Sequence, residues 1–576
     1  MKLIVPYIGE LRTADSRLIR LAEFLGIRCE PLRLDKQVQA RAEYIVRAVP
    51  DQNSCLLVNP QVMREWVGGN VLPADLVSCL VSHFPRHLVH GVTRGTFVDG
   101  MMVSLSNGRL HSVQPVADPG LLYEISTNSE DFCGPFSGLS FGPINAANDS
   151  VLAVNADDET VRKLICIGGH PLMAAIKRDK TEILFLASED TADINTEIGY
   201  APLSDYFSRL IPHAMALRQI FGEECWRPDE PHASIIIDDP LLQRHYGCLN
   251  FESLLRLTQR YNFHTTIAFI PHNYKRNSAR ITRMFREHSD RLSICFHGND
   301  HTAAELASTD TALLNTMLGI AEERMNAHEQ TTGLRCGKVM VFPQGRFSAE
   351  AMKVLKCRNF HAAVNTVHAP IGQQFPLTIA DFAQPAVLRY GGFPLFIRTY
   401  VNKTQTQDIA FNLFFGRPVL IVEHHDIFRQ HESLVDVVQK VNSIAPGICW
   451  SNLESAVDNS ILRRRAPDGT VQVRAYSSSV RIANDSAAVE RFSIEWNQPG
   501  EYSPFEQVLR DGVRLPGAEA DDAGIRILAE LSPHTSQTFS VLYRTAQTTN
   551  KDLGFRWNAK AFLRRRLSEV RDNYLS

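Results

Sequence analysis

The sequence predicts an α/β protein of several domains, with helix-covered parallel strands at its centre and a β-sandwich followed by a helix at its C-terminal end. Between about residues 231 and 455, apolar runs of four to six residues recur, separated by stretches with helical spacing. This repeated order of strand and helix implies parallel strands covered by helices, in an open sheet or a barrel. After about residue 460, short runs that alternate polar and apolar residues predict an antiparallel sandwich.

The length and composition are those of a multidomain globular protein. At 576 residues the chain is too long for one hydrophobic core, and about three or four domains are expected. Its 44% hydrophobic and 21% charged residues are typical of a soluble fold. A net charge of −3 and a pI near 6.7 leave no electrostatic footprint for nucleic acid, so we expect no nucleic-acid partner.

Cysteine usage and the first residues indicate a cytoplasmic protein. The eleven cysteines are scattered singly with no CxxC pair, which fits a reducing compartment better than a disulfide framework. The apolar run within residues 1–10 is too short for a secretory signal. No stretch approaches the ~20 uninterrupted apolar residues that a membrane span needs.

The first 225 residues are predicted to form two α/β domains. Residues 1–110 alternate strand-like runs such as Lys2–Tyr7 with helical spacing as in Ser16–Leu25, which indicates a small layer of parallel strands and helices. No glycine-rich loop follows the first strand, so no dinucleotide site is expected there. Residues 111–225 mix short strands with turns and end in an amphipathic helix at Leu203–Phe221, and their role is not predicted.

The central region, residues 231–455, contains the residues that carry chemistry. In folds with parallel strands the active site lies at the carboxyl ends of the strands. Asp239, His297 and the pair His424–His425 all lie at or just beyond such ends. The expected strands include Ser234–Ile237, Thr265–Ile270, Leu292–Phe296, Val339–Phe342, Ala362–Asn365 and Val419–Glu423, and the expected helices Phe251–Tyr261, Ser278–His288, Asp310–His328 and Leu434–Ile444.

The C-terminal region, residues 460–576, is predicted to be the β-sandwich followed by a basic amphipathic helix at Lys560–Leu575. Two interpretations of the helix stay open: it could lie on an acidic membrane surface as a peripheral contact, or pack on its own domain with a solvated basic face. Its apolar stripe is Leu563, Leu567, Val570 and Tyr574, and its basic residues are Lys560, Arg564, Arg565, Arg566 and Arg571.

Two strand ends provide a candidate metal site. Asp238 and Asp239 end the run before Pro240, where the chain must turn and both carboxylates can converge. His297 and His301, spaced i and i+4, follow the run Leu292–Phe296. One carboxylate and two imidazoles leave a zinc ion one open position for water, as hydrolysis requires. The alternatives are an Asx turn or helix cap at the aspartates, and a chance pair of histidines in a loop.

Two further strand ends add groups that such a site could use. Pro343-Gln344-Gly345 forms a rigid loop whose backbone N–H groups could face a developing oxyanion, although by itself it is an ordinary turn. The strand at Val419–Glu423 ends in His424-His425-Asp426, which offers an imidazole held by a carboxylate, the arrangement of a general acid.

The order of these motifs resembles the polysaccharide deacetylase family (carbohydrate esterase family 4, the NodB-homology fold) over about residues 231–455. The resemblance implies a distorted (β/α) barrel of about seven strands. It also implies that Asp238 is the general base, that Asp239, His297 and His301 bind the metal, and that His425, rather than His424, is the general acid. The backbone at Pro343, Gln344 and Gly345 would help to bind the substrate and form the oxyanion site.

The sequence departs from the family pattern at three places. Gly298 stands where the family has Thr or Ser, and Val341 stands where it has an arginine. Arg389, in the segment 388–392, could supply that charge to the substrate site from another loop. The fourth motif of the family, Asp-x-x-Asp-Trp, is absent.

The expected function is therefore that of a metal-dependent hydrolase, most simply with Zn²⁺, that removes an N- or O-linked acetyl group from a carbohydrate. A cytoplasmic location would suit a nucleotide-linked or lipid-linked precursor of a polysaccharide. Two alternatives stay open: a binding or scaffold protein whose barrel has lost activity, and a barrel glycoside hydrolase, which would need two carboxyl groups about 5–9 Å apart.

Overall fold

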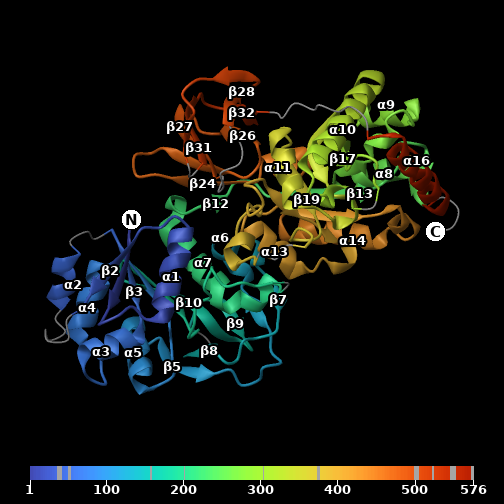
Figure 1. The fold of residues 1–576 in the computed structure, drawn as a ribbon. Coiled ribbons are helices and arrows are strands. Elements are labelled where there is room, and N and C mark those ends of the chain that lie inside the picture. The colour runs from blue at the N-terminus through green and yellow to red at the C-terminus, as the bar shows by residue number, and fades with distance from the viewer. Residues whose placement is uncertain are drawn as a thin grey trace. The chain divides into compact units, whose positions relative to one another are not determined.

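The computed structural model describes residues 1–34, 42–49, 53–155, 158–199, 201–302, 304–372, 376–497, 505–521, 524–544 and 553–572. The chain divides into two compact units, one formed by Met1–Arg227 with Leu377–Ala380 and the other by Pro228–Pro376 with Asp381–Ser576 (Figure 1). The boundary expected at residue 110 therefore lies inside the first unit, and the one expected between residues 455 and 460 lies inside the second.

The first unit is built on one nine-stranded sheet in the order β2-β1-β3-β4-β11-β10-β9-β6-β7. Its parallel half continues into its antiparallel half because β4 pairs in parallel with β11, so strands from both expected domains share one sheet. The strands are β1 (Leu3–Tyr7), β2 (Cys29–Arg33), β3 (Cys55–Val58), β4 (Arg86–Val89), β6 (Tyr123–Ile125), β7 (Ser140–Phe141), β9 (Val161–Ile167), β10 (His170–Arg178) and β11 (Thr181–Leu186), with a separate pair of β5 (Leu110–Pro115) and β8 (Ser150–Val154). The helices are α1 (Thr13–Phe24), α2 (Ala42–Ala48), α3 (Pro60–Val67), α4 (Ala74–His83), α5 (Thr96–Ser106), α6 (Glu130–Cys133) and α7 (Phe207–Phe221).

The second unit contains the predicted sheet of parallel strands, in the order β20-β19-β18-β17-β16-β13-β22-β21. All seven residues of its central strand β13 (His232–Asp238) are buried, as expected for a strand that is covered on both faces. The other strands are β16 (Thr265–Phe269), β17 (Leu292–His297), β18 (Cys336–Val341), β19 (Ala362–Asn365), β20 (Leu395–Ile397), β21 (Thr399–Tyr400), β22 (Val419–Glu423) and β23 (Cys449–Trp450), which pairs with β13. The helices are α8 (Phe251–Tyr261), α9 (Ala279–Glu287), α10 (Thr311–Thr332), α11 (Ala349–Cys357), α13 (Thr406–Phe414), α14 (Glu432–Ile444) and α15 (Leu453–Asp458).

One short segment nearly closes this sheet into a barrel. β20 pairs with β19 at one edge and β21 pairs with β22 at the other, yet β20 and β21 are separated in the chain only by Arg398. The segment Leu395–Tyr400 thus bridges the two edges. The sheet path has eight strands rather than the expected seven because this bridging segment counts as two. The predicted α/β architecture with a barrel-like parallel sheet is confirmed.

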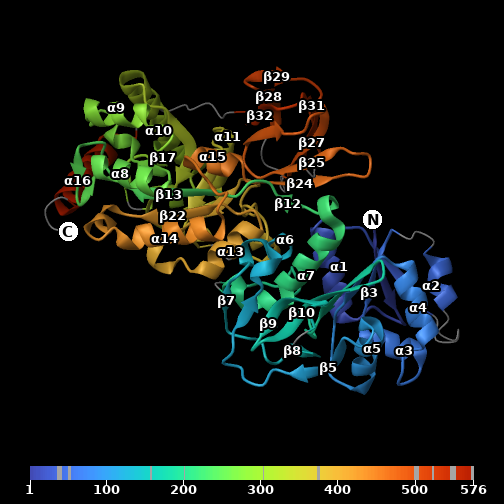
Figure 2. The same cartoon turned by 180° about the vertical axis from the view of Figure 1, so that it is seen from behind.

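The region from residue 461 to 543 forms two sheets that share one hydrophobic core (Figure 2). The pairing is not purely antiparallel as expected, because β25 and β27 are parallel neighbours. The intervening strand β26 pairs with β32 in the other sheet, so the chain crosses over and returns in the same direction. The strands are β24 (Ile461–Arg465), β25 (Val471–Ala475), β26 (Ser479–Asn484), β27 (Glu490–Asn497), β28 (Phe505–Arg510), β29 (Val513–Leu515), β30 (Glu519–Asp521), β31 (Gly524–Leu531) and β32 (Thr535–Tyr543).

The last helix, α16 (Phe555–Val570), packs on the barrel. Figures 1 and 2 both show it, in red, beside α8 and α9. An ion pair between Arg276 and Glu569 anchors it there. Tyr574, which was expected on its apolar stripe, lies outside the described residues. None of the helices in the described part of the chain is both long enough and apolar enough to cross a bilayer.

Candidate metal centre

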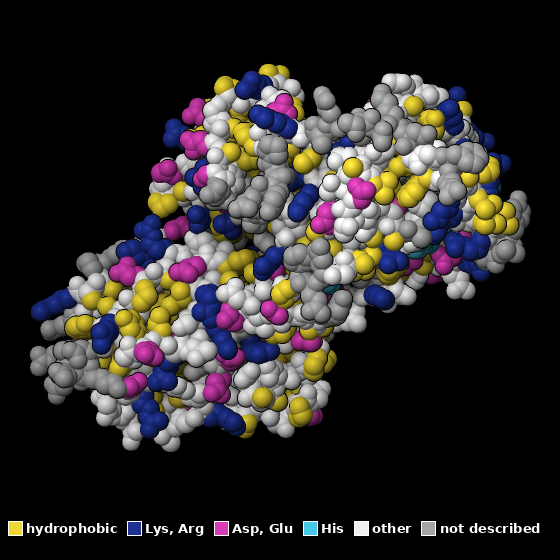
Figure 3. Space-filling model, in the orientation of Figure 1, with side chains coloured by type: hydrophobic (Ala, Val, Ile, Leu, Met, Phe, Trp, Pro, Cys, Tyr) yellow, Lys and Arg dark blue, Asp and Glu magenta, His cyan; other side chains and the backbone are white. Residues whose placement is uncertain are grey.

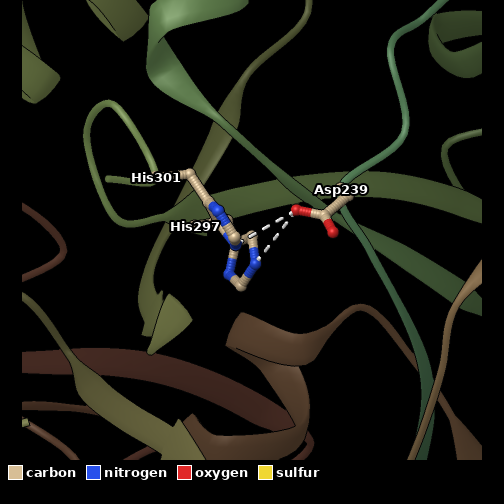
Figure 4. A group of neighbouring side chains, drawn as sticks. All are labelled: Asp239, His297 and His301. Carbon is tan, nitrogen blue, oxygen red and sulfur yellow. Dashed lines mark ion pairs between the residues drawn. The ribbon is translucent and has the colours of Figure 1, made fainter. Parts of the chain in front are cut away.

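The ends of β13 and β17 bring three potential metal ligands together. Asp239 follows the last residue of β13 with a φ of 83°, a left-handed conformation that turns its carboxylate away from the alternation of the strand. His297 ends β17, and His301 reaches the same place from the loop after it, also with a positive φ of 54°. Figure 4 shows both imidazole rings turned toward the carboxylate of Asp239.

The distances within this group suit a metal ion. Nε2 of His297 and Nε2 of His301 lie 3.5 and 3.3 Å from Oδ1 of Asp239. Two ligands at ~2.1 Å from a tetrahedral zinc ion would be ~3.4 Å apart. Oδ1 of Asp239 is buried and has no hydrogen-bond partner among the described residues, as expected for an oxygen that awaits a cation. The three residues therefore fit a divalent ion with an open coordination position.

The protonation states of Asp239 and His301 also suit a metal site. Burial would raise the pKa of Asp239, but the imidazoles of His301 and His297 hold that pKa well below its usual value. Burial lowers the pKa of His301 to about 3, so its imidazole is neutral at neutral pH and has a lone pair to donate. Nδ1 of His297 lies 3.0 Å from the carbonyl oxygen of Val341 and donates to it, which leaves Nε2 free to face Asp239.

Asp238, the candidate base, is paired with an arginine that the sequence analysis missed. Nη1 and Nη2 of Arg398 each lie 2.7 Å from one carboxylate oxygen of Asp238, and both side chains are buried. Burial would raise the pKa of Asp238, but this guanidinium holds it below its usual value. Arg389, which was expected to supply the charge, instead pairs with Asp381.

Arg398 is in place because of the way the barrel closes. It is the single residue between β20 and β21, and β21 lies beside β22, the neighbour of β13. The sequence did contain a signal, since Arg398 directly follows the apolar run Leu395–Ile397, like the other strand-end residues of the site. Val341, where the family pattern has an arginine, has its side chain buried in the core.

The loop that carries His301 is held by Glu305, a second residue that the sequence analysis missed. The buried carboxylate of Glu305 accepts hydrogen bonds from the backbone N–H groups of residues 299, 300, 301 and 302, at 2.8 to 3.2 Å. A Cβ atom on Gly298 would collide with this carboxylate and with the ring of Pro343. The glycine that departs from the family pattern is therefore required by the packing of this loop.

His425, the candidate acid, is buried beside groups from two distant segments. Its ring packs edge-to-face on Tyr246 with centroids 5.3 Å apart, and its Nε2 lies 3.9 Å from Oδ1 of Asp572. The carboxylate at this imidazole is thus Asp572, just after α16, whereas the adjacent Asp426 is exposed. Oδ2 of Asp572 accepts a hydrogen bond of 2.8 Å from Tyr246. The ring of the neighbouring His424 stacks with Tyr400.

Helix α16 lies over the metal centre. The guanidinium of Arg565 is buried, with Nη2 3.3 Å from Nδ1 of His301. Trp557 donates a hydrogen bond of 2.8 Å to Asp300 in the loop of His301. His297 is 1% and His301 8% exposed, and the side chain of Asp239 is 14% exposed, so this helix covers most of the centre.

The loop Pro343–Gly345 lies against the loop that carries His301. Pro343 approaches Gly298, and Oε1 of Gln344 accepts a hydrogen bond of 3.4 Å from the backbone of Ala304. The N–H of Gly345 donates to the carbonyl of Phe342 at 3.3 Å within a tight turn. The structure thus places this segment beside the ligand loop, with Gln344 in a left-handed conformation.

Comparisons with known proteins give no family assignment. No family model and no curated protein matches the chain. Among solved structures, the chain is similar to Agd3, described as a novel carbohydrate deacetylase, at 9% identity and a TM-score of 0.49, over 94% of this chain and 98% of that one.

Other similarities cover a smaller share of the chain. A putative polysaccharide deacetylase from Mycobacterium smegmatis matches at 13% identity and a TM-score of 0.28, over 40% of this chain and 92% of that one. A family 4 acetyl xylan esterase from Clostridium thermocellum, solved with a cobalt ion, matches at 13% identity and a TM-score of 0.25, over 39% of this chain and 89% of that one. Because all of these scores are below 0.5, the assignment of function rests on the geometry of the site.

Proposed function

We propose that this protein is a metal-dependent hydrolase that removes an N- or O-linked acetyl group from a carbohydrate. The observation that carries the proposal is the convergence of Asp239, His297 and His301 at one point, next to Asp238, a buried carboxylate kept ionised by Arg398. A three-residue N/O ligand set with an open position is that of a hydrolytic zinc site, which makes Zn²⁺ the first candidate.

Asp238 and His425 each carry out one of the two proton transfers of the reaction. A divalent ion held by Asp239, His297 and His301 would supply a Lewis acid that polarises the acyl carbonyl and acidifies water. Asp238, ionised beside Arg398, accepts the proton of the attacking water. His425, oriented by Asp572 and Tyr246, returns a proton to the leaving amine or alcohol. The backbone of Pro343–Gly345 forms the substrate side of the site.

Two competing functions have less support. A glycoside hydrolase needs one carboxylic acid with a raised pKa, whereas the pKa values of both Asp238 and Asp239 lie below their usual range. The second alternative, an inactive scaffold, rests on the arginine missing at Val341 and on the absent fourth motif, and the buried pair of Arg398 with Asp238 instead supports an ionised base. Both observations favour hydrolysis of an acyl group.

The coverage of the site by α16 bears on the class of carbohydrate. Arg565 and Asp572, which lie beside His301 and His425, are each 5% exposed, and this coverage suits a small substrate better than a long polymer. We infer that the substrate is a small acetylated sugar, such as a nucleotide-linked or lipid-linked precursor. Acetate release from acetylated nucleotide sugars, compared with release from chitin oligomers and acetylated xylan, tests this preference.

The test of the reaction is acetate release by the metal-loaded protein and its variants. Asp238→Asn should retain the metal and lower turnover by about 10²–10⁴-fold, the usual contribution of a general base. Asp426→Asn, an exposed carboxylate next to His425, is the matched control and should keep turnover. Full activity of Asp238→Asn, or turnover that is unaffected when a chelator removes all metal, would contradict the proposal.

A further inference from the structure

Helix α16 places its apolar and charged faces the opposite way from an ordinary surface helix. Such a helix turns its apolar stripe to the core and its charged face to water. In α16 the side chains packed on the barrel include Trp557, Ala561 and Arg565, and the last of these is charged and only 5% exposed. The four large apolar side chains point the other way: Phe562, Leu563, Leu567 and Val570 are 57%, 60%, 62% and 49% exposed.

These exposed side chains form one continuous stripe, which we call the outer face of α16 and define as Phe562, Leu563, Arg566, Leu567 and Val570. Their spacing of i, i+1, i+4, i+5 and i+8 places them on one side of the helix. In the space-filling view, hydrophobic side chains gather at this end of the molecule next to basic ones (Figure 3). Contiguous exposed apolar side chains mark a surface that contacts another protein, a membrane or a ligand.

Basic side chains border and interrupt the outer face. Arg566 lies within it, is 54% exposed and lies 3.6 Å from Glu569. Arg571 follows it, is 67% exposed and pairs with Asp572 at 2.7 Å, and Lys560 is exposed on its flank. The helix is locally basic although the whole chain has a net charge of −3. Apolar side chains flanked by Lys and Arg match a lipid interface, where acyl chains accept the former and anionic headgroups the latter.

A second copy of the chain fits this face less well. A two-fold symmetric contact through α16 would set the basic residues of one copy, Arg566 first, against the same residues of the other. We therefore propose that the outer face of α16 docks the protein reversibly on an anionic membrane surface. The inner face of the helix needs no rearrangement for this, because Arg276–Glu569, Trp557–Asp300 and Tyr246–Asp572 already hold it on the barrel.

The experiment is flotation of the full-length protein with vesicles of phosphatidylcholine alone or of phosphatidylcholine mixed with phosphatidylglycerol. Binding should require phosphatidylglycerol and weaken as salt is added, because the attraction of the headgroups is screened. The double variant Leu563→Ser, Leu567→Ser should lower the bound fraction by about tenfold or more. Arg566→Glu should also lower it.

Matched controls distinguish an effect of the outer face on vesicle binding from a general effect of losing exposed apolar or charged side chains. Val513→Ser with Leu528→Ser removes side chains that are 71% and 67% exposed on β29 and β31, and Arg491→Glu reverses a charge that is 62% exposed on β27. These variants should bind like the wild type, and circular dichroism should show every variant folded.

Three outcomes would overturn the proposal. The wild type could fail to float with anionic vesicles, or the leucine double variant could float as well as the wild type. The third is a dimer in sedimentation velocity that the leucine double variant converts to a monomer, which would assign the outer face to a second copy of the chain.

Discussion

At Asp238 a carboxylate that is almost fully buried stays ionised because both of its oxygens accept hydrogen bonds of 2.7 Å from Arg398. Removal of one partner of such a pair leaves an uncompensated buried charge, which costs more than the loss of the contact. The arginine acts through the aspartate and is therefore a positioning residue: it sets the pH range over which Asp238 can accept a proton.

Arg398→Met tests this role. Because Arg398 lowers the pKa of Asp238, its loss raises that pKa, so the ionised base disappears at a higher pH as the solution is acidified. We expect the acid limb of the pH–rate profile to shift upward, turnover near neutral pH to fall by about 10²-fold or more, and the stability to fall by about 3–5 kcal/mol.

Arg389→Met is the matched control, because Arg389 pairs with Asp381 and is 48% exposed. It should leave the acid limb where it is. An acid limb that does not move in Arg398→Met would show that Arg398 does not set the ionisation of Asp238.

How much of the site the sequence predicts depends on the sequence separation of its contacts. Asp239 and His297 are recognisable because each ends an apolar run, and the same rule could have identified Arg398. Glu305 and Arg565 leave no such signal, because in the sequence both look like ordinary surface charges. Glu305 binds backbone N–H groups, and Arg565 lies 264 residues from His301 in the chain. Asp572 was missed for the same reason, and Asp426 was expected in its place only because it is adjacent to His425.

At the scale of elements, hydrogen bonds to one buried carboxylate give the loop after β17 its shape. Glu305 accepts four backbone N–H groups from residues 299–302, and Gly298 leaves room for that carboxylate. This arrangement fixes the position of His301, which otherwise sits on an irregular stretch of chain with a left-handed residue.

Gly298→Ser, which restores the residue type of the family pattern, should therefore damage the site. The added side chain collides with Glu305 and Pro343, so we expect a lower melting temperature and a metal affinity reduced by about 10–100-fold. Gly68→Ser provides the control, because Gly68 has the same φ of 64° but open space around it. Equal metal affinity in Gly298→Ser and the wild type would refute this account of the loop.

Helix α16 places the guanidinium of Arg565 beside His301 at the metal centre. The N–H of Arg565 can donate to Nδ1 of His301 only if that imidazole carries its proton on Nε2, the nitrogen that faces Asp239. A metal ligand at Nε2 requires the opposite tautomer, so Arg565 and a divalent ion compete for His301.

Arg565→Met should consequently bind the metal more tightly, by about tenfold, because the competing donor and its charge are removed. A competition titration with a chromophoric chelator measures this change. Arg564→Met, one residue away on the same helix, should show the affinity of the wild type. A weaker metal affinity in Arg565→Met would mean that the arginine supports the site instead of competing for it.

For the whole molecule, local periodicity predicted the helix-covered parallel strands, and the helix Phe251–Tyr261 was predicted with its observed bounds. The nine-stranded sheet that joins both expected N-terminal domains was not predicted, because the pairing of β4 with β11 links residues almost a hundred positions apart. Barrel closure at Arg398 and the return of α16 to the barrel are likewise long-range contacts.

Buried neutral histidines predict how the stability of the molecule depends on pH. Burial lowers the pKa of His232 and of His264 to about 4. Below the usual pKa of about 6.5 the unfolded chain binds protons that the folded chain does not, so stability falls as the pH drops from about 6.5 toward 4. Each histidine should cost about 2 kcal/mol at pH 5.

Thermal unfolding between pH 7 and pH 5 measures this loss. His264→Asn should flatten the dependence of the melting temperature on pH, whereas His534→Asn, at an exposed position, should leave its slope unchanged. An unchanged slope in His264→Asn would show that the unfolded state gains no proton at this position relative to the folded one.

Anomalous diffraction at the zinc edge, from crystals grown with Zn²⁺, would show whether Asp239, His297 and His301 hold one catalytic metal ion. We expect a single strong peak about 2.0–2.2 Å from Oδ1 of Asp239 and from Nε2 of both histidines. Strong anomalous peaks elsewhere in the crystal, with none between these three side chains, would contradict this expectation.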